Sequence, residues 1–186
     1  MYIFTHLEPF FCHRFFPCFD QPSVRAPLKL SVVAPNQEWN VIANGEETDV
    51  KKMPMRSEEA QRVINETRFE GQTASDGFLW DFETTPAISS YIYCVCAGNY
   101  KMIKNMAPNA STPMRIFARE SKFAYCNHEE VFRIVQEGID FYKELFGYKF
   151  PFAKYDVIYC PEFRIGAMEN VGAVTFTDRV LKPLDE

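Results

Sequence analysis

The sequence is short of basic residues and of long apolar runs, and each shortage removes a class of function. Its 20 Lys and Arg are outnumbered by 25 Asp and Glu, which gives a net charge of −5. The basic residues form no block, so the charge pattern does not favour binding to nucleic acid or to an anionic membrane. No stretch approaches the roughly 18 uninterrupted apolar residues of a membrane-spanning helix, so we expect no membrane segment in this chain.

The apolar start of the chain and its cysteines bear on its location. Glu8 interrupts the apolar run Met1–Phe16, which lacks both a basic beginning and an Ala-x-Ala cleavage site. The six cysteines form no Cys-x-x-Cys pair and are too few for a disulfide scaffold, so we expect reduced, mostly buried thiols. Cys94 and Cys96 would share one face of a strand. These features favour a cytoplasmic protein, with a secreted protein or the ectodomain of a membrane-anchored enzyme as the alternative.

Short catalytic motifs are absent as well. The sequence has no GxSxG nucleophile turn, no GxxxxGK phosphate loop and no GxGxxG dinucleotide turn. His6, His13 and His128 are its only histidines. His128 begins a segment similar to the HExxH zinc motif, but Phe132 stands where the second imidazole should be. By local motifs the chain therefore predicts no metal site, and we interpret His128 as a solvated residue in the first turn of a helix.

The sequence is rich in aromatic residues and predicts a β-rich first part followed by a mixed second part. Its 18 Phe, 9 Tyr and 2 Trp require a large core or a large interface. Alternating and apolar runs predict strands at 28–34, 39–43, 63–70, 78–82, 88–97, 155–159 and 172–177, the fifth of them central. Asn44-Gly45 is typical of a hairpin turn, and the polar, proline-containing segment 105–113 is the expected connection between the two parts.

One clear helix is expected in the second part. Asn127 can cap it, and Glu130 lies three residues later in a capping-box arrangement. Gly147 supplies a stop signal. Apolar residues recur between these ends at helical spacing, at Val131, Ile134, Val135, Ile139, Tyr142, Leu145 and Phe146.

The segment Arg164–Gly172 is the most informative stretch of the chain. Two small residues, Gly166 and Ala167, precede Met168, a carboxylate at Glu169 and an apolar strand. Small residues let another backbone approach and pair along an exposed sheet edge, which would place Glu169 at the end of a bound peptide. The alternative is a plain turn that leads into a strand, with Glu169 solvated.

Four sequence blocks in order resemble one known family. Gly166–Asn170 (GAMEN) is similar to the exopeptidase signature of the large zinc aminopeptidases, which include aminopeptidase N and the puromycin-sensitive enzyme. Thr5–Pro22 resembles the TQFEP…RRxFPCFDxP block of that family. Thr85–Tyr91 resembles its TPxxSxY strand, and Phe150–Asp156 resembles its FPxxKxD stretch. The resemblance covers essentially the whole chain.

The resemblance implies a fold class and a division into domains. We expect an α+β chain with an antiparallel, β-rich and saddle-like N-terminal part. Residues 1–112 would be the C-terminal portion of the N-terminal β-domain. Residues 113–186 would be the beginning of a thermolysin-like zinc-peptidase domain, with its first helix and strands, truncated before HExxH.

The resemblance also implies roles for individual residues. Glu169 and Glu8 would hold the α-ammonium of a peptide substrate, while Gly166, Ala167 and Met168 line its backbone as an edge strand. The partner is then the N terminus of a peptide, and the cofactor is zinc in the full-length protein, with ligands that this chain does not contain. No other catalytic residue is expected here, so the isolated chain should be inactive.

Departures from the family pattern leave a second function open. His6 and Leu7 replace the usual Gln and Phe, and Val171 stands where many members have Trp, which would widen the first specificity pocket. The alternative function is a non-catalytic fragment or pseudo-enzyme that acts as a peptide-binding or scaffold module. An in-frame HExxH beyond Glu186, with a later Glu, would indicate the enzyme.

Overall fold

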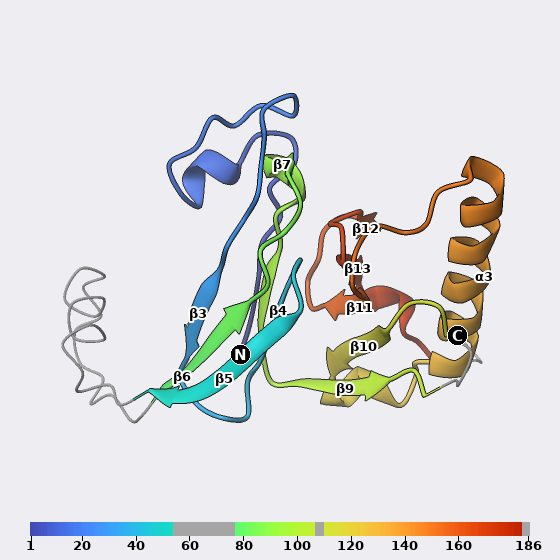
Figure 1. Cartoon of the computed structure of the whole chain (residues 1–186). Helices are drawn as coiled ribbons and strands as arrows, with labels where there is room; N and C mark the ends of the chain where they lie inside the picture. The colour runs from blue at the N-terminus through green and yellow to red at the C-terminus, as the bar shows by residue number, and fades with distance from the viewer. Residues whose placement is uncertain (54–76, 107–109, 184–186) are drawn as a thin grey trace.

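The structure is a computed structural model that describes residues 1–53, 77–106 and 110–183. Its first part is built almost entirely from short strands (Figure 1). The elements are β1 (Tyr2–Phe4), η1 (Cys12–Arg14), β2 (Arg25–Ala26), β3 (Ser31–Ala34), β4 (Asn40–Ala43), β5 (Glu47–Met53), β6 (Gly77–Phe82), β7 (Ile88–Ser89), η2 (Ser90–Ile92) and β8 (Val95–Gly98). They form antiparallel sheets in the orders β1-β8-β4, β3-β6-β5 and β2-β7. The predicted strand at 63–70 lies outside the described residues.

The predicted strand 88–97 is wrong as a single element. It is divided into β7, the 3-10 turn η2 and β8, and only β8 is the central strand of its sheet. Polar side chains explain the break: the hydroxyl of Ser89 donates to the carbonyl of Pro22 at 2.6 Å, and that of Ser90 donates to Asp20 Oδ1 at 2.8 Å. These bonds bind the chain to the loop before β2 and interrupt the ladder.

The expected hairpin at Asn44-Gly45 is also wrong. β4 pairs with β8 and β5 pairs with β6, so this dipeptide passes the chain from one sheet to another. Gly45 is needed there for space, because a Cβ would collide with the carbonyl of Glu83. The buried Asn44 side chain takes part in the site described below.

The second part contains a mixed five-stranded sheet, in the order β12-β13-β11-β10-β9. Parallel pairing joins β10, β11 and β13, and antiparallel strands form both edges. Its elements are β9 (Tyr100–Lys104), β10 (Met114–Arg119), α2 (Glu120–Phe123), α3 (His128–Phe146), β11 (Tyr155–Cys160), β12 (Ala167–Met168), β13 (Ala173–Thr177) and η3 (Asp178–Val180). The overall α+β class, mostly antiparallel with one main helix, is confirmed.

The sheet of the second part begins before the expected boundary. β9 starts at Tyr100 and pairs with β10, so the segment predicted as the connection, 105–113, joins two adjacent strands of one sheet. The backbone N–H of Asn105 donates to the carbonyl of Met114 at 2.9 Å, where these two strands face each other. The division at 112 and 113 stays a prediction.

Helix α3 begins and ends as the sequence predicts. The Asn127 side chain accepts a hydrogen bond from the backbone N–H of Glu130, and Gly147 ends the helix with a φ of 63°. The second half of the expected capping box is wrong, because the Glu130 carboxylate instead pairs with Arg133 at 2.6 Å. Within α3 only Phe132 is fully buried, and the apolar residues of its last turns are largely exposed.

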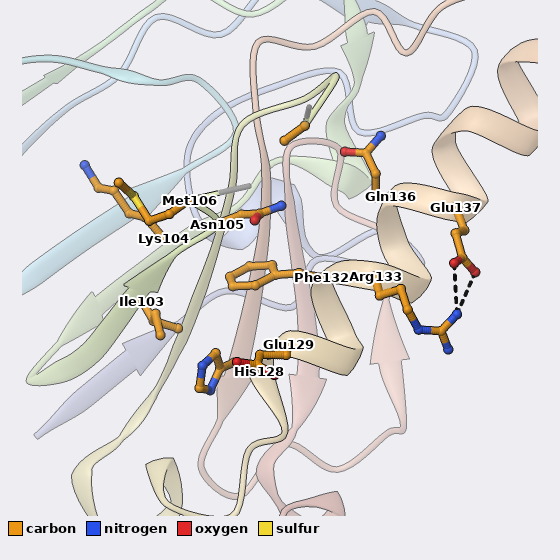
Figure 2. Close-up of a pocket in the computed structure, with 11 residues that line it drawn as sticks. Ile103, Lys104, Asn105, Met106, His128, Glu129, Phe132, Arg133, Gln136 and Glu137 are labelled. Carbon is orange, nitrogen blue, oxygen red and sulfur yellow. Dashed lines mark hydrogen bonds and ion pairs between the residues drawn. The ribbon is translucent and has the colours of Figure 1, made fainter. Parts of the chain in front are cut away.

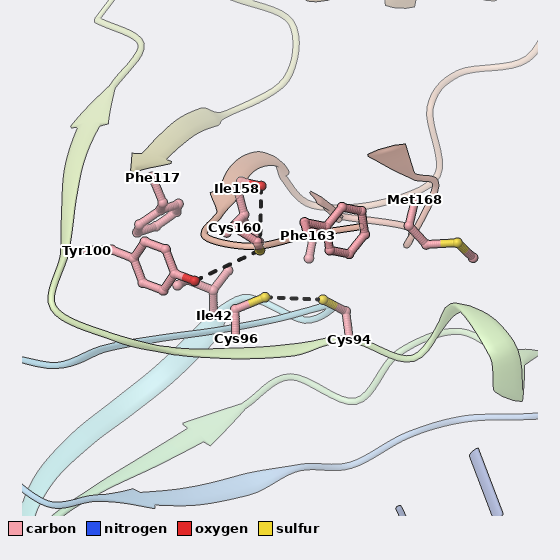
Figure 3. Close-up of a cluster of buried hydrophobic side chains, with 10 residues drawn as sticks. Ile42, Cys94, Cys96, Tyr100, Phe117, Ile158, Cys160, Phe163 and Met168 are labelled. Carbon is pink, nitrogen blue, oxygen red and sulfur yellow. Dashed lines mark hydrogen bonds between the residues drawn. The ribbon is translucent and has the colours of Figure 1, made fainter. Parts of the chain in front are cut away.

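Alternating side chains of the five-stranded sheet pack against two different layers. Ile116 and Val157 contact Phe132 of α3 on one face. Phe117 and Ile158, the next residues along the same strands, face Ile42, Cys94 and Cys96 of the N-terminal sheet. Figure 3 shows this second layer, in which buried apolar side chains of both parts pack together. The sheet therefore lies between α3 and the sheet β1-β8-β4, and the two parts share one core (Figure 1).

All six cysteines carry free thiols, and five of them are buried, as expected. The sulfur atoms of Cys94 and Cys96 lie 3.8 Å apart, which confirms that they share one face. The thiol of Cys160 accepts from the hydroxyl of Tyr100 at 3.9 Å in the same core. Burial raises the pKa of Cys12, in the first part, to about 12.

Candidate functional site: the GAMEN edge strand

The GAMEN segment (Gly166–Asn170) forms the edge of the five-stranded sheet. Ala167 and Met168 make up β12, which pairs with β13 alone, and the N–H of Thr177 donates to the carbonyl of Gly166 at 3.0 Å. Paired and unpaired positions alternate along an antiparallel ladder, so the N–H and C=O of Ala167 point away from β13. Among the described residues no strand occupies that outer side. The geometry offers a place for one extended peptide strand.

Side chains of the GAMEN segment divide between the core and the solvent. Met168 is 1% exposed and packs in the core that joins the two parts. Ala167 and Glu169 are exposed, and a Cβ at Gly166 would meet nothing within 4 Å. Met168 therefore anchors the strand, and the small residues leave its outer surface open. The structure places Met168 beneath that surface rather than on it.

The turn after Glu169 is held internally. Asn170 is 1% exposed. Its side-chain amide donates to the hydroxyl of Thr175 at 3.2 Å, and its backbone carbonyl accepts from the backbone N–H of Ala173 at 3.0 Å. Gly172 closes the turn with a φ of 73°, and a Cβ there would lie 2.5 Å from the carbonyl oxygen of Asn44. The turn thus lies directly against the N-terminal part, where only glycine fits.

Asn44 binds this turn to the N-terminal sheet. Its side-chain amide donates to the carbonyl of Val171 at 2.8 Å and to that of Ile92 at 2.9 Å. Its side-chain oxygen accepts from the N–H of Cys94 at 2.7 Å. One buried side chain therefore connects three backbone segments and fixes the GAMEN turn relative to β8. Sequence reasoning assigned Asn44 to a hairpin and missed this role, because the contacts span up to 127 residues.

Lys154 makes a second connection between the same two parts. Its ammonium donates to the carbonyls of Gly172 at 2.7 Å and Ala43 at 2.8 Å, and to Asp156 at 2.7 Å. Lys154 is 2% exposed and Asp156 is 0% exposed. A buried cation is stable only when its donors are matched, and here each of its three N–H groups has an acceptor.

Arg115 extends the ionic contacts to β5. Its guanidinium binds Asp156 in a bidentate manner, at 2.8 Å through Nε and 2.7 Å through a terminal nitrogen, and it also pairs with Glu47. Burial alone would raise the pKa of Glu47, but the hydrogen bond and charge of Arg115 outweigh it and lower that pKa. The Lys154–Asp156–Arg115–Glu47 network therefore binds β5 to β10 and β11 of the five-stranded sheet.

The residues beside Glu8 pack near the GAMEN turn. Leu7 is buried in an apolar cluster against which Val171 and Phe152 pack. The rings of Phe4 and His6 lie 5.5 Å and 5.6 Å from that of Phe163, in edge-on contacts. Glu8 and Glu169 are themselves both exposed. The structure thus brings together the two segments that carry these carboxylates, and the meeting of the carboxylates around one ligand stays a prediction.

Two pockets of the described structure are lined neither by Glu8 nor by residues of the GAMEN segment. A pocket of about 330 Å³ beside Glu8 is lined by His6, Leu7, Phe11, Arg14 and Phe15. A groove of about 620 Å³ lies between β9 and the first half of α3; Phe132 points into it, and Arg133 turns away toward Glu137 (Figure 2). His128 lines this groove with its ring edge-on to Phe132, 6.5 Å away, where a zinc helix would need a second imidazole.

Comparison with known proteins decides the family. The family model of the peptidase M1 N-terminal domain matches residues 1–92, and that of the peptidase family M1 domain matches residues 131–183. The chain belongs to peptidase family M1. Its GAMEN segment lies within residues 131–183, the part that the M1 domain covers.

Relatives of this M1 chain carry aminopeptidase names. It is 32% identical over 180 residues to aminopeptidase N of Streptomyces lividans, covering 96% of this chain and 18% of that protein. It is 30% identical to probable aminopeptidase 1 of Sulfurisphaera tokodaii, covering 96% and 20%, and 26% identical to aminopeptidase N of Bos taurus, covering 95% and 16%. The chain spans about a fifth of the length of the curated relatives it matches. In its described part, no helix is both long and apolar enough to cross a membrane.

Proposed function

We propose that this M1 chain supplies the amine-binding part of a zinc-dependent aminopeptidase, which removes N-terminal residues from peptides. The observation that carries the proposal is the open edge of β12, whose following turn Asn44 and Lys154 bind to the N-terminal part. In that part Leu7, the neighbour of Glu8, lies in the apolar cluster against which Val171 packs. A peptide added to this edge would run along Ala167, with its first residue beside Glu169.

Charge gives the proposed site its preference for a free N terminus. A carboxylate about 4 Å from an ammonium contributes about 1 kcal/mol of attraction in water and about 4 kcal/mol at an effective dielectric constant near 20. Glu8 and Glu169 are exposed in the described structure, so the higher value applies only when bound peptide excludes water. Two carboxylates around one ammonium would fix the depth of the peptide and select its first peptide bond.

Residues of this chain do not fit the zinc ion of the family. One turn after His128 the chain has Phe132 and not a second imidazole, and His6 and His13 lie on the N-terminal part, in separate contacts with Phe163 and Asp20. The chain's own contribution is to bind and orient the peptide backbone and the ammonium.

Peptide binding tests the proposal without activity. We expect the chain to bind a short peptide with a free N terminus more tightly than its N-acetylated form, as measured by calorimetry or chemical-shift titration. Glu169→Gln and Glu8→Gln should each abolish most of this difference. Glu129→Gln is the matched control, because Glu129 is an exposed carboxylate in the groove of α3. Equal affinity for both peptides, or equal effects of all three substitutions, would contradict the proposal.

A further inference from the structure

Three metal-binding side chains lie together after β1. One donor atom from each of Cys12, Cys18 and Asp20 lies within 4.8 Å of the other two donor atoms. Cys12 is fully buried in η1, whereas Cys18 and Asp20 are partly exposed, so the group lies at the surface of the core. We propose that Cys12, Cys18 and Asp20 form a binding site for one zinc ion. The proposal does not depend on the aminopeptidase function.

The spacing of the donor atoms suits a small tetrahedral ion. Zinc binds thiolate sulfur at about 2.3 Å, which places two sulfur ligands about 3.8 Å apart in a tetrahedron. The present donor atoms therefore need to approach one another by no more than about 1 Å. Two thiolates with one carboxylate leave a fourth position, which water can fill. Five residues separate the two cysteines and one residue separates Cys18 from Asp20, a spacing that matches no common zinc motif.

The Asp20 carboxylate is already oriented by other groups. Its Oδ2 accepts from the backbone N–H of His13 at 3.0 Å and lies 3.0 Å from Nδ1 of the same residue, and its Oδ1 accepts from the hydroxyl of Ser90 at 2.8 Å. A carboxylate offers about four acceptor positions, so these three contacts leave one for an ion. Groups that orient a ligand in this way typically raise metal affinity, because the ligand loses little freedom on binding.

The carboxylate also distinguishes a metal site from a disulfide. A disulfide between Cys12 and Cys18 would gain nothing from Asp20, and a negative charge beside two thiols opposes the thiolate form that forms the bond. A divalent cation reverses this effect, because it neutralises two thiolates and the carboxylate together. The surrounding apolar side chains, Leu7 and Tyr93 among them, lower the local polarity and strengthen that attraction.

Cobalt titration of the reduced, metal-free full chain tests the site. Co²⁺ serves as the spectroscopic probe; we expect thiolate-to-cobalt absorption that saturates at one ion per chain and disappears when Zn²⁺ is added. Cys12→Ser and Cys18→Ser should each weaken Co²⁺ binding by about tenfold or more. Cys126→Ser is the matched control, since Cys126 is buried in a different cluster, between α3 and the sheet. This control should leave the titration unchanged.

A second measurement keeps the test independent of folding defects in the variants. In the unmodified reduced chain, Zn²⁺ should slow the alkylation of Cys18, the partly exposed thiol, as followed by mass spectrometry. The proposal is overturned if the cobalt–thiolate band is absent or survives both substitutions. It is equally overturned if Zn²⁺ gives Cys18 no protection from alkylation.

Discussion

Replacing Lys154 by methionine removes the cation that joins the two parts of the chain beside the GAMEN turn. The substitution keeps most of the volume of the side chain but leaves the carbonyls of Ala43 and Gly172 without this donor. Asp156 keeps its bidentate contact with Arg115. Loss of one partner from a buried ionic group typically costs about 3–5 kcal/mol. We expect a loss of that size in the free energy of unfolding, a large part of the roughly 5–15 kcal/mol of a typical domain.

Pulse proteolysis across a urea series measures this loss at low protein concentration. With a typical urea dependence of about 2 kcal/mol per molar, the midpoint of unfolding should fall by about 2 M. Lys101→Met is the matched control, because Lys101 pairs with Glu120 at 2.9 Å on the surface, where both side chains are exposed. An exposed pair contributes less than about 1 kcal/mol. If both substitutions shift the midpoint equally, the buried network does not hold the two parts together.

Three further predictions use the same protein. Gly172→Ala should destabilise the fold by about 1 kcal/mol or more, because Gly172 has a positive φ and lies against the carbonyl of Asn44. Gly138→Ala should stabilise the fold by about 0.5–1 kcal/mol, because a Cβ at this position of α3 meets no other atom. Urea midpoints that move in the same direction for both variants would contradict this prediction. The fold lowers the pKa of Glu47, so the ionised Glu47 stabilises the folded chain at pH values above its ordinary pKa of 4.5. This stabilisation is lost as the pH falls through the lower pKa of the folded state. Below that pH, the free energy of unfolding of Glu47→Gln should therefore fall less steeply with pH than that of the unmodified chain. An equal decline in the variant and the unmodified chain would contradict the pairing of Glu47 with Arg115. The isolated chain with added zinc should not hydrolyse aminoacyl-naphthylamides, and clear turnover would refute this expectation.

Local sequence signals predicted those elements whose causes are local. The cap at Asn127 and the stop at Gly147 lie next to the backbone groups they satisfy, so the ends of α3 could be predicted from the sequence. The apolar run at 155–159 is flanked by parallel neighbours on both sides and became β11. The short strands β1, β9 and β10 were not predicted as such, because pairing partners rather than their own residues make them strands.

Errors in the prediction arose where side chains form distant bonds. Ser89 and Ser90 bind the loop before β2 and divide a run that is apolar enough for one long strand. Asn44-Gly45 has the composition of a hairpin turn, yet Gly45 is required by a passing carbonyl and Asn44 by three backbone groups. Neither effect leaves a periodic signal in the sequence.

The sequence by itself determined the family, the single long helix and the exposed carboxylates of the candidate site, because ordered motifs and helix caps are written in neighbouring residues. Only the tertiary structure decided that the GAMEN segment pairs with β13, that Lys154 and Asn44 bind the turn after it to the N-terminal part, and that Cys12, Cys18 and Asp20 lie together. The physical reason is that hydrogen bonds and buried charges act over a few ångströms of space, whatever the distance along the chain.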